Sequence, residues 1–239
     1  MLGRLQGNSE VKVACCLSGQ PRNYKTGIHN LLNFFEGVDV DYYAHTWIDS
    51  DKYGVVRYSA NQKDMSEWSI DSECEAKIIE TLKPKKHIFE SQIDFSPIRN
   101  YSENNQTNMK PENFLSMTYS RKKSFSLIED SEYDLVVIGR FDVSYQSKAK
   151  NFIDNCSDDT LYTLHVDGEV WNRTHINDPF LLATPSVIRH AVRLYDHFDK
   201  YYLEGTPFCP HRLLMRHMKE FKNIGFDSVC HGNWGYIRK

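Results

Sequence analysis

The sequence lacks any long hydrophobic run. Its longest apolar stretches, over 11–17 and 135–138, are far shorter than the roughly 20 residues that span a bilayer. Its first ten residues are polar and show neither the basic start nor the apolar core of about 7 to 15 residues that marks a secretory signal. We therefore expect a cytoplasmic protein without a membrane span, whose residues 1–10 are flexible.

Clustered cysteine and an excess of positive charge are missing as well. The six cysteines include no C-x-x-C pair and no dense spacing, which argues against a zinc ribbon and against a disulfide scaffold. Lysine and arginine together number 29 against 32 aspartates and glutamates, for a formal net charge of -3. This balance provides no general attraction for nucleic acid or an anionic membrane, so neither is an expected partner.

The chain does contain a regular alternation of strand-like and helix-like segments. Short apolar runs rich in β-formers predict strands at 11–18, 38–48, 87–90, 133–138 and 161–166. Helical spacing of apolar residues predicts helices at 24–35, 72–82, 112–132, 185–202 and 210–220. The alternation predicts a single three-layer α/β/α domain over 1–239, with a mostly parallel central sheet and a Rossmann-like nucleotide-binding half.

Two polar segments without periodicity, 49–70 and 91–111, interrupt this alternation. We expect both to be surface loop insertions, and we expect 91–111 to be a mobile lid because it is rich in Asn, Ser and Pro. Ligands of such sheets bind beyond the carboxyl ends of the strands, where loops gather. Residues that directly follow a predicted strand are therefore the first candidates for a functional site.

The first candidate is Ser18-Gly19-Gln20-Pro21-Arg22, which follows the first predicted strand. Glycine lets the backbone approach a ligand closely, and the arginine fork can bind two phosphate oxygens. The chain contains neither a Rossmann G-x-G-x-x-G nor a Walker loop. The pattern is compatible with a phosphate-binding loop and with an ordinary Gly-Pro turn that carries a solvated arginine.

The second candidate is Arg140-Phe141-Asp142, directly after the predicted strand at 133–138. Side chains at alternate positions of a strand point to the same face, so Arg140 and Asp142 can converge on one ligand. A carboxylate here suits a hard cation such as Mg²⁺ or Mn²⁺ that holds a diphosphate. A salt bridge between the two residues at the strand end is the equal alternative.

The third candidate is Asp178, which stands before Pro179 near the start of the predicted helix at 185–202. Because Pro179 fixes the backbone, Asp178 suits either a helix cap or a general base for a sugar hydroxyl. Asp167 and Glu169 precede it and are reserve candidates for the base.

The fourth candidate is the tail at 231–238, which is dense in glycine and aromatic residues. Such a composition is unlike a disordered end, and we expect the tail to fold back over the sheet. His231 is a candidate second metal ligand, and Trp234 and Tyr236 are candidates for stacking on a base or sugar. Most lone histidines have no such role.

Five segments, taken in chain order, carry a resemblance to a known family. They are CLSGQPR at 16–22, YYAHTW at 42–47, YSRKK at 119–123, the stretch 133–142, and NDPF at 177–180. Together they resemble the small GT-A fold glycosyltransferases found in viral and bacterial polysaccharide gene sets. The resemblance covers about residues 11–182 and depends on the order of the segments more than on any one of them.

The resemblance implies roles for several residues in binding the donor. The loop after the first strand contacts the nucleotide in such enzymes, which implicates Ser18, Gly19, Gln20 and Arg22. The YSRKK segment adds Lys123 to the donor-binding residues.

The resemblance also implies a metal site. The family's D-x-D motif binds Mn²⁺ or Mg²⁺ and the donor diphosphate. Arg140 replaces its first aspartate here, so only Asp142 inherits the metal and Arg140 meets a phosphate or ribose directly. Some members of the family bind the metal with a late histidine, for which His231 is the candidate here. The family's Asp-x-Phe segment lies near the acceptor, and it corresponds to the segment here that begins with Asp178.

The implied activity is that of a hexosyltransferase-like enzyme of polysaccharide biosynthesis. It would move a sugar from a nucleotide-diphosphate sugar donor to a glycan or another hydroxyl acceptor. Such a reaction needs positive groups on the departing diphosphate and a carboxylate that orients or deprotonates the acceptor. Two alternatives remain open: a nucleotidyltransferase, and a GT-A-like scaffold that binds a sugar or a partner protein without catalysis.

Overall fold

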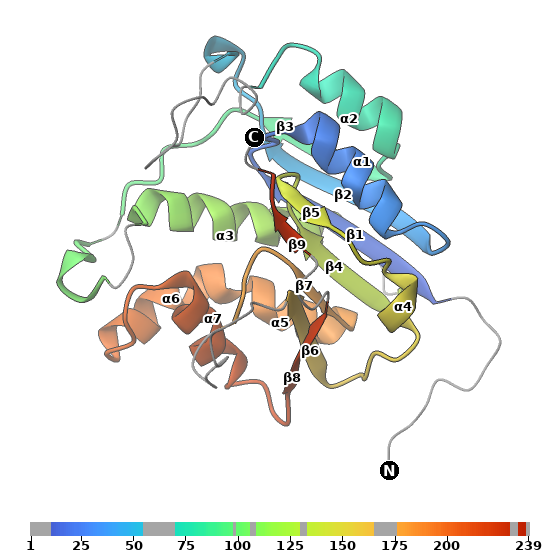
Figure 1. The fold of residues 1–239 in the computed structure, drawn as a ribbon. Helices are drawn as coiled ribbons and strands as arrows, with labels where there is room; N and C mark the ends of the chain where they lie inside the picture. The colour runs from blue at the N-terminus through green and yellow to red at the C-terminus, as the bar shows by residue number, and fades with distance from the viewer. Residues whose placement is uncertain are drawn as a thin grey trace.

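The computed structural model describes residues 11–54, 70–97, 99–105, 109–129, 133–164, 176–229 and 234–237. At its centre is a seven-stranded sheet in the order β3-β2-β1-β4-β7-β6-β8 (Figure 1). These strands are β1 Lys12–Gly19, β2 Asp39–Trp47, β3 Lys86–Glu90, β4 Leu135–Gly139, β6 Thr160–Leu164, β7 Leu181–Ala183 and β8 Gly225–Val229.

Strand direction confirms the expectation of a mostly parallel sheet. β1 pairs in parallel with both β2 and β4, and β2 pairs in parallel with β3. β6 and β8 are also parallel to each other, and β7 runs antiparallel to its neighbours β4 and β6. The carboxyl ends of β1, β2, β3 and β4 therefore meet at one edge of the sheet, where ligands of α/β proteins bind.

Helices cover both faces of the sheet, which confirms the three-layer α/β/α class. On one face lie α1 Tyr24–Phe34, α2 Cys74–Leu82 and α4 Lys150–Ile153. On the other lie α3 Pro111–Ser126, α5 Pro185–Val192, α6 Leu194–Leu203 and α7 Pro210–Met218 (Figure 1). The nearly continuous apolar run of β1 explains this arrangement, because alternate residues of a strand point to opposite faces. Cys15 packs with the α1 side and Cys16 with the α3 side.

The helix expected at 185–202 is two helices, which corrects the prediction. α5 ends at Val192 and α6 begins at Leu194, with Arg193 as the cap residue between them. Both helices contribute to the same core, through Ile188 of α5 and Phe198 of α6. Apolar spacing shows which residues face the core, but it contains no signal for the break at Arg193. The pattern therefore predicted one helix.

Several other elements differ from the sequence prediction. The helix expected at 112–132 ends at Ser126, and Leu127 and Ile128 pack against the core beyond its end. The strands β5 Val143–Tyr145 and β7 are three residues long each, too short to leave a periodic pattern. None of the helices in the described part of the chain is long and apolar enough to cross a membrane.

The C-terminal segment returns to the carboxyl end of β4, as the composition of the tail predicted. β9 Trp234–Tyr236 pairs antiparallel with β5, with Tyr236 opposite Val143. The backbone N–H of Ile237 then donates to the carbonyl oxygen of Asp142 at 3.0 Å. The end of the described chain is thus bonded to one of the candidate site residues.

Helix α1 lies unusually close to the same segment because of one glycine. A Cβ atom on Gly27 would lie 1.6 Å from the carbonyl oxygen of Phe141, so only glycine permits this approach. β5 lies beside α1 in Figure 1. The backbone at 140–142 is therefore held between α1 and β9, directly behind the candidate site.

Candidate active site

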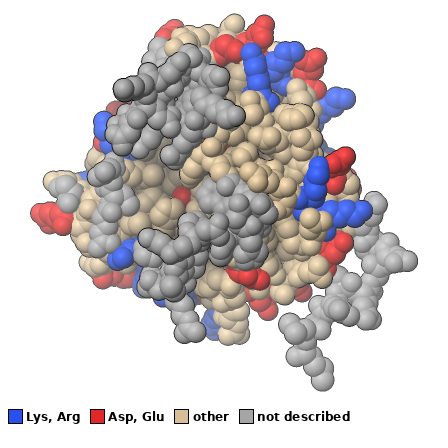
Figure 2. All heavy atoms as spheres, viewed as in Figure 1, with Lys and Arg blue, Asp and Glu red and all other residues tan. Residues whose placement is uncertain are grey.

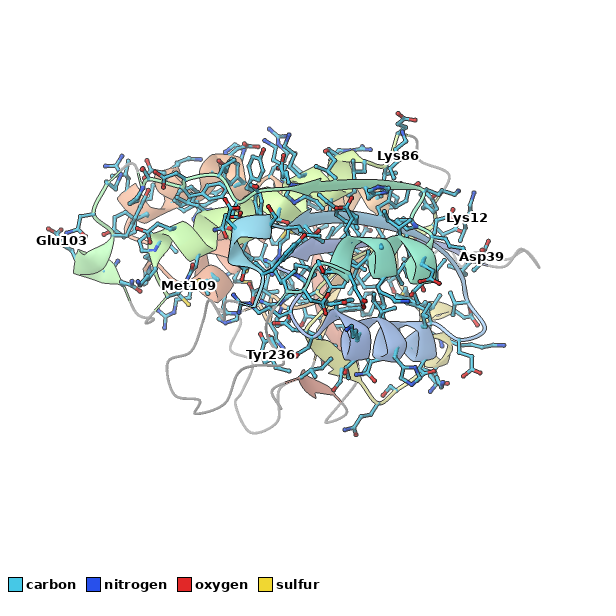
Figure 3. All side chains as sticks on the ribbon, turned by 90° about the horizontal axis from the view of Figure 1, so that it is seen from above. Lys12, Asp39, Lys86, Glu103, Met109 and Tyr236 are labelled. Atoms are coloured by element: carbon cyan, nitrogen blue, oxygen red, sulfur yellow. The ribbon has the colours of Figure 1, made fainter. Side chains whose placement is uncertain are left out.

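The structure contains a cavity of about 690 Å³ at the carboxyl ends of the parallel strands. Its size lies within the range of about 300 to 1,000 Å³ typical of small-molecule sites. Its walls are formed by Ser18, Gly19, Gln20, Arg22, Trp47, Gln92, Ile93, Asp94, Phe95, Met109, Glu112, Asn113, Ser116, Met117, Arg140, Asp142 and Tyr236. Figure 3 shows the amino-terminal residues Lys12, Asp39 and Lys86 of three strands at one end of the molecule and Met109 and Tyr236 away from them.

The loop after β1, with Ser18, Gly19, Gln20 and Arg22, forms one wall of this cavity. Its predicted role in donor binding stays a prediction. Gly19 has a φ of 93°, in the left-handed region that favours glycine. Its N–H donates to the side-chain oxygen of Ser120 at 2.7 Å. Helix α3 therefore holds the turn in place from the opposite side.

A chain of hydrogen bonds runs across the cavity wall from this loop to α3. Nη2 and Nε of Arg22 donate to Oε1 of Gln20 at 2.6 and 3.0 Å. Nε2 of Gln20 donates to Oε1 of Gln92 at 3.2 Å, and Nε2 of Gln92 reaches Oγ of Ser116 at 3.4 Å. This chain orients both carboxamide groups and keeps the Arg22 guanidinium at the cavity.

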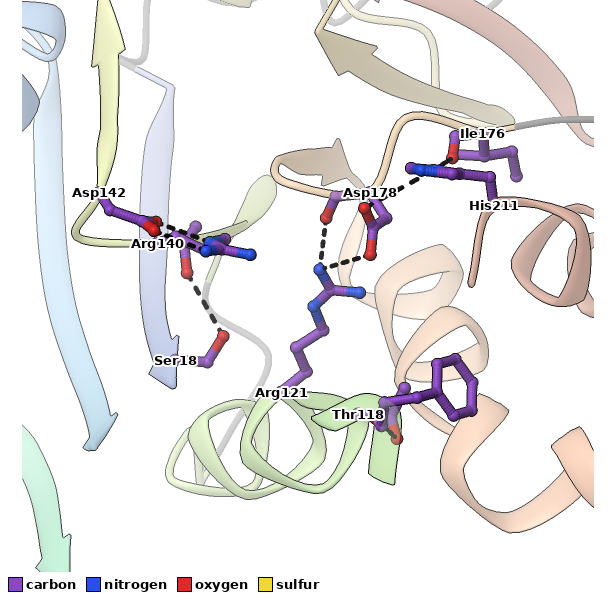
Figure 4. Close-up of polar contacts among 10 residues, drawn as sticks. Ser18, Thr118, Arg121, Arg140, Asp142, Ile176, Asp178 and His211 are labelled. Atoms are coloured by element: carbon purple, nitrogen blue, oxygen red, sulfur yellow. Dashed lines mark hydrogen bonds and ion pairs between the residues drawn. The ribbon is translucent and has the colours of Figure 1, made fainter. Parts of the chain in front are cut away.

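Arg140 and Asp142 form a two-point ion pair at the end of β4 (Figure 4). Nε of Arg140 donates to Oδ1 of Asp142 at 2.7 Å, and Nη2 donates to Oδ2 at 2.6 Å. The Arg140 side chain is 27% exposed and the Asp142 side chain 5%, so mainly the cation faces the cavity. Burial by itself raises the pKa of Asp142, but the attraction of Arg140 outweighs it, and this pKa lies below its usual value.

The tail contributes an aromatic contact to this pair. The Arg140 guanidinium carbon lies 5.4 Å from the centre of the Tyr236 ring, a cation–π distance. Tyr236 also lines the cavity, as its predicted stacking role requires. Asn23 binds the tail from the other side by donating Nδ2 to the carbonyl oxygen of Ile237 at 2.7 Å.

Asp178 is buried outside the residues that line the cavity, in an ion pair with Arg121. Nη2 of Arg121 lies 2.5 Å from the carbonyl oxygen of Asp178 and 3.1 Å from its Oδ2, and Nδ1 of His211 lies 3.6 Å from Oδ1. Burial raises the pKa of Asp178, but the interactions with Arg121 and His211 lower it by more than burial raises it. The pKa of Asp178 therefore lies below its usual value. A lower pKa makes a weaker base, and the base role of Asp178 stays a prediction.

Sequence reasoning did not assign Arg121 to this contact. The only signal was a run of basic residues inside an otherwise amphipathic helix, and a run of that kind usually faces solvent. Here Arg121 is 5% exposed and points inward from α3 (Figure 4).

The remaining predicted residues lie elsewhere. The Lys123 ammonium lies over the Tyr119 ring at 5.4 Å, and Lys123 is not among the residues that line the cavity. Asp167, Glu169 and His231 lie outside the described residues. Their roles stay predictions.

The described residues around Asp142 do not fit a divalent cation. Both carboxylate oxygens of Asp142 accept hydrogen bonds from Arg140. Over the described ranges, no group of three or more His, Cys, Asp or Glu side chains is placed to hold a metal ion. The assignment of Mn²⁺ or Mg²⁺ to Asp142 and His231 therefore stays a prediction from the resemblance.

Several cavity residues were not predicted, and they include aromatic and amide side chains. Trp47 at the end of β2 is 2% exposed and stacks on Tyr119 with 5.7 Å between ring centres. Its indole N–H has no hydrogen-bond partner among the described residues. Gln92 and Phe95 come from the segment at 91–111, whose position after β3 was the available signal.

Ser120, His45 and Glu90 form a hydrogen-bonded line beneath the loop, in which Ser120 and His45 are buried. Nδ1 of His45 lies 2.8 Å from Oγ of Ser120, and Nε2 lies 2.9 Å from Oε1 of Glu90. The three residue types match a hydrolase triad, but Ser120 is fully buried and its oxygen already accepts the Gly19 N–H. A nucleophile must reach its substrate, so the line is a support for the Gly19 turn.

Fold and site together define an α/β/α domain with a strand-end cavity that two arginines border. No protein-family model matches the chain, and no curated protein matches its sequence. Two solved structures of the glycosyltransferase GlyE from Streptococcus pneumoniae, one of them the apo form, align over 93% of the chain with a TM-score of 0.48. Their sequence identities are 14% and 12%, and the chain spans 45% of the length of each.

Proposed function

We propose that the protein is a glycosyltransferase that moves a sugar from a nucleotide-diphosphate sugar to a hydroxyl acceptor. The observation that carries the proposal is the convergence of Arg22 and Arg140 on one cavity. They follow two adjacent parallel strands, β1 and β4, at the edge where α/β sheets bind nucleotides. Arginine forks are well suited to the oxygens of a diphosphate.

The cavity lining combines arginines with aromatic and carboxamide side chains, from which we infer how the donor is oriented. The diphosphate is expected at Arg22 and Arg140, and the nucleoside toward Trp47, Gln92 and Phe95. Aromatic faces and carboxamides stack on and hydrogen-bond with nucleobases. Trp47 lines the cavity, and its buried indole N–H has no hydrogen-bond partner among the described residues.

The reaction requires that charge be neutralised on the leaving group. The acceptor oxygen forms a bond to the anomeric carbon, the bond from that carbon to the phosphate oxygen breaks, and the electron pair leaves with the nucleoside diphosphate. Fixed positive groups at this oxygen lower the barrier because negative charge grows there. Arg22 and Arg140 are the described residues placed for this role.

The acceptor proton must pass to a base. Asp178 is the residue that the resemblance assigns, with Asp167 and Glu169 in reserve, and its ion pair with Arg121 makes it a weak base. Asp94 and Glu112 are carboxylates that line the cavity itself, and we add both to the candidates.

Nucleotide binding and product analysis test the proposal. A thermal-shift series with UDP, GDP, CDP and ADP is expected to show stabilisation of the wild-type protein by at least one of them. The matching sugar nucleotides, offered with simple sugar acceptors, should then release the nucleoside diphosphate, with a new glycoside in the mass spectrum.

Each other outcome has its own meaning. No stabilisation by any nucleotide would overturn the proposal. Transfer of a nucleoside monophosphate would identify a nucleotidyltransferase. Binding without transfer to any acceptor would favour a non-catalytic scaffold, a candidate that has support because Arg140 and Arg121 neutralise Asp142 and Asp178.

A further inference from the structure

The Arg140–Asp142 pair has an arrangement that distinguishes it from a metal-binding carboxylate. Arg140 covers both oxygens of Asp142 with parallel hydrogen bonds, the bidentate geometry that gives arginine–carboxylate pairs their strength. A cation that bound Asp142 would have to share the carboxylate with the positive charge of the guanidinium. The more exposed partner is Arg140, so an incoming anion meets the guanidinium first.

Arg140 keeps donors for such an anion. A guanidinium has five N–H groups, and Asp142 accepts two of them. The other three have no acceptor among the described residues, and Arg140 lines the cavity.

Further contacts hold the pair in place. The Tyr236 ring lies 5.4 Å from the guanidinium carbon, and the N–H of Ile237 holds the carbonyl oxygen of Asp142 at 3.0 Å. The Asp178 carboxylate stabilises the charge of Arg140 from across the site (Figure 4). A cation in a fixed position needs no reorganisation when charge develops next to it.

The charges at this end of the cavity match what a metal would supply. At the ends of β1 and β4, Arg22 and Arg140 carry two positive charges against the single negative charge of Asp142. A divalent cation on one carboxylate leaves the same net positive charge. Without any metal, these two strand ends therefore present a positive centre to a diphosphate, whereas the other acidic residues of the lining, Asp94 and Glu112, come from the segment after β3 and from α3.

We propose that Arg140, positioned by Asp142, takes the place of a divalent cation, and that the site binds the donor diphosphate without a metal. Asp142 is then a positioning residue for Arg140 and not a metal ligand. This inference rests on the proposed function, because it concerns the same donor site.

Calorimetric titration of the wild-type protein tests it directly. The probe is the nucleoside diphosphate that stabilises the protein most, measured with excess EDTA and again with Mn²⁺ or Mg²⁺. The two dissociation constants are expected to agree within about twofold, because the arginines supply the charge. Binding that requires the metal would overturn the inference but leave the proposed function intact, whereas no binding in either buffer would contradict the proposed function itself.

Two variants separate the residues that a metal site would need from those that an arginine site needs. Arg140→Gln is expected to weaken binding in EDTA by about tenfold or more, since it removes the charge and the fork. Asp142→Asn is expected to retain binding within about fivefold, since the guanidinium remains. A metal site predicts the reverse order, with Asp142→Asn the more damaging.

Folding of the variants is checked by their thermal unfolding, because Arg140→Gln leaves a buried carboxylate unpaired. The control is Arg189→Gln, which removes an arginine that lies over Phe125 outside the cavity; its affinity should equal that of the wild type.

A further variant, Arg140→Asp, restores the family's two aspartates and is expected to bind the nucleotide only when Mn²⁺ is added. Binding by Arg140→Asp in EDTA with wild-type affinity would contradict the role of Arg140.

Discussion

Arg121 on α3 donates hydrogen bonds to both the carbonyl and the carboxylate oxygen of Asp178, 57 positions further along the chain. The two side chains are 6% and 9% exposed. This buried ion pair joins α3 to the segment that leads into β7, directly across from Arg140 (Figure 4). The helix that supports the Gly19 turn is thereby tied to the second half of the sheet.

Removing one partner of this pair should destabilise the protein strongly. Arg121→Met leaves the Asp178 carboxylate buried without its cation, and we expect a loss of about 3 to 5 kcal/mol in the free energy of unfolding, measured in urea. The double variant with Asp178→Asn should recover part of that loss. Lys122→Met is the control, because its ion pair with Asp196 is 43% and 35% exposed and is worth under about 1 kcal/mol. Equal effects of Arg121→Met and Lys122→Met would refute a structural role for the pair.

Gly27→Ala should destabilise the protein even though this change usually strengthens a helix by about 1 kcal/mol. The added Cβ would lie 1.6 Å from the Phe141 carbonyl oxygen, so α1 or the segment at 140–142 must move. We expect a loss of about 1 to 3 kcal/mol in thermal unfolding and weaker nucleotide binding. Thr26→Ala, at an exposed position of the same helix, should change neither. An unchanged or higher melting temperature for Gly27→Ala would show that the contact is not close.

Trp47→Phe tests whether the Trp47 side chain contacts the nucleotide in addition to packing in the core. It removes the indole N–H that has no partner among the described residues, and we expect nucleotide affinity to fall by about fivefold, the equivalent of a ~1 kcal/mol hydrogen bond. Phe198→Leu is the control: it also shrinks a buried ring, in α6 away from the cavity lining, and should lower stability without changing affinity. If both variants bind the nucleotide like the wild type, Trp47 does not contact it.

Acidification should weaken the helical layer through His217. Burial lowers the pKa of His217 from 6.5 to about 4, while Nε2 of His217 lies 2.7 Å from the carbonyl oxygen of His190. A folded-state pKa below the unfolded one means that unfolding takes up a proton between these values, so stability is complete above pH 6.5 and declines as the pH falls toward 4.

Urea unfolding at pH 7.5 and pH 5 measures this effect, which is at most about 3 kcal/mol over the whole interval. His217→Phe should flatten the dependence, and His29→Gln, on the exposed face of α1, should leave it as in the wild type. A wild-type stability that does not change between the two pH values would be inconsistent with a neutral, buried His217.

The acidic and basic side chains on the surface add little to these predictions. Figure 2 shows Lys and Arg interspersed with Asp and Glu around the visible face, without a continuous area of one sign among the residues drawn in colour. This agrees with the formal net charge of -3. The polar interactions with large expected effects are the buried ones, because solvent screens exposed pairs.

The sheet could be predicted because its strands are buried on both faces. β1 and β4 are nearly continuous apolar runs, a pattern typical of strands covered on both faces, and Arg22 and Arg140, which follow their ends, line the cavity. The break between α5 and α6 and the three-residue strands could not be predicted, because they leave no period in the sequence. Arg121 was missed because its partner lies 57 positions away.

The sequence by itself determined the alternation of strands and helices and which side chains follow the strand ends, because these depend on local apolar spacing. It left Asp142 open as either a metal ligand or the partner of Arg140, since a spacing of two residues permits both. The tertiary structure, for the described chain, pairs Asp142 with Arg140, while the metal role stays a prediction. Close packing at Gly27 and the bond from Ile237 hold the backbone, and Arg140 takes both carboxylate oxygens of Asp142.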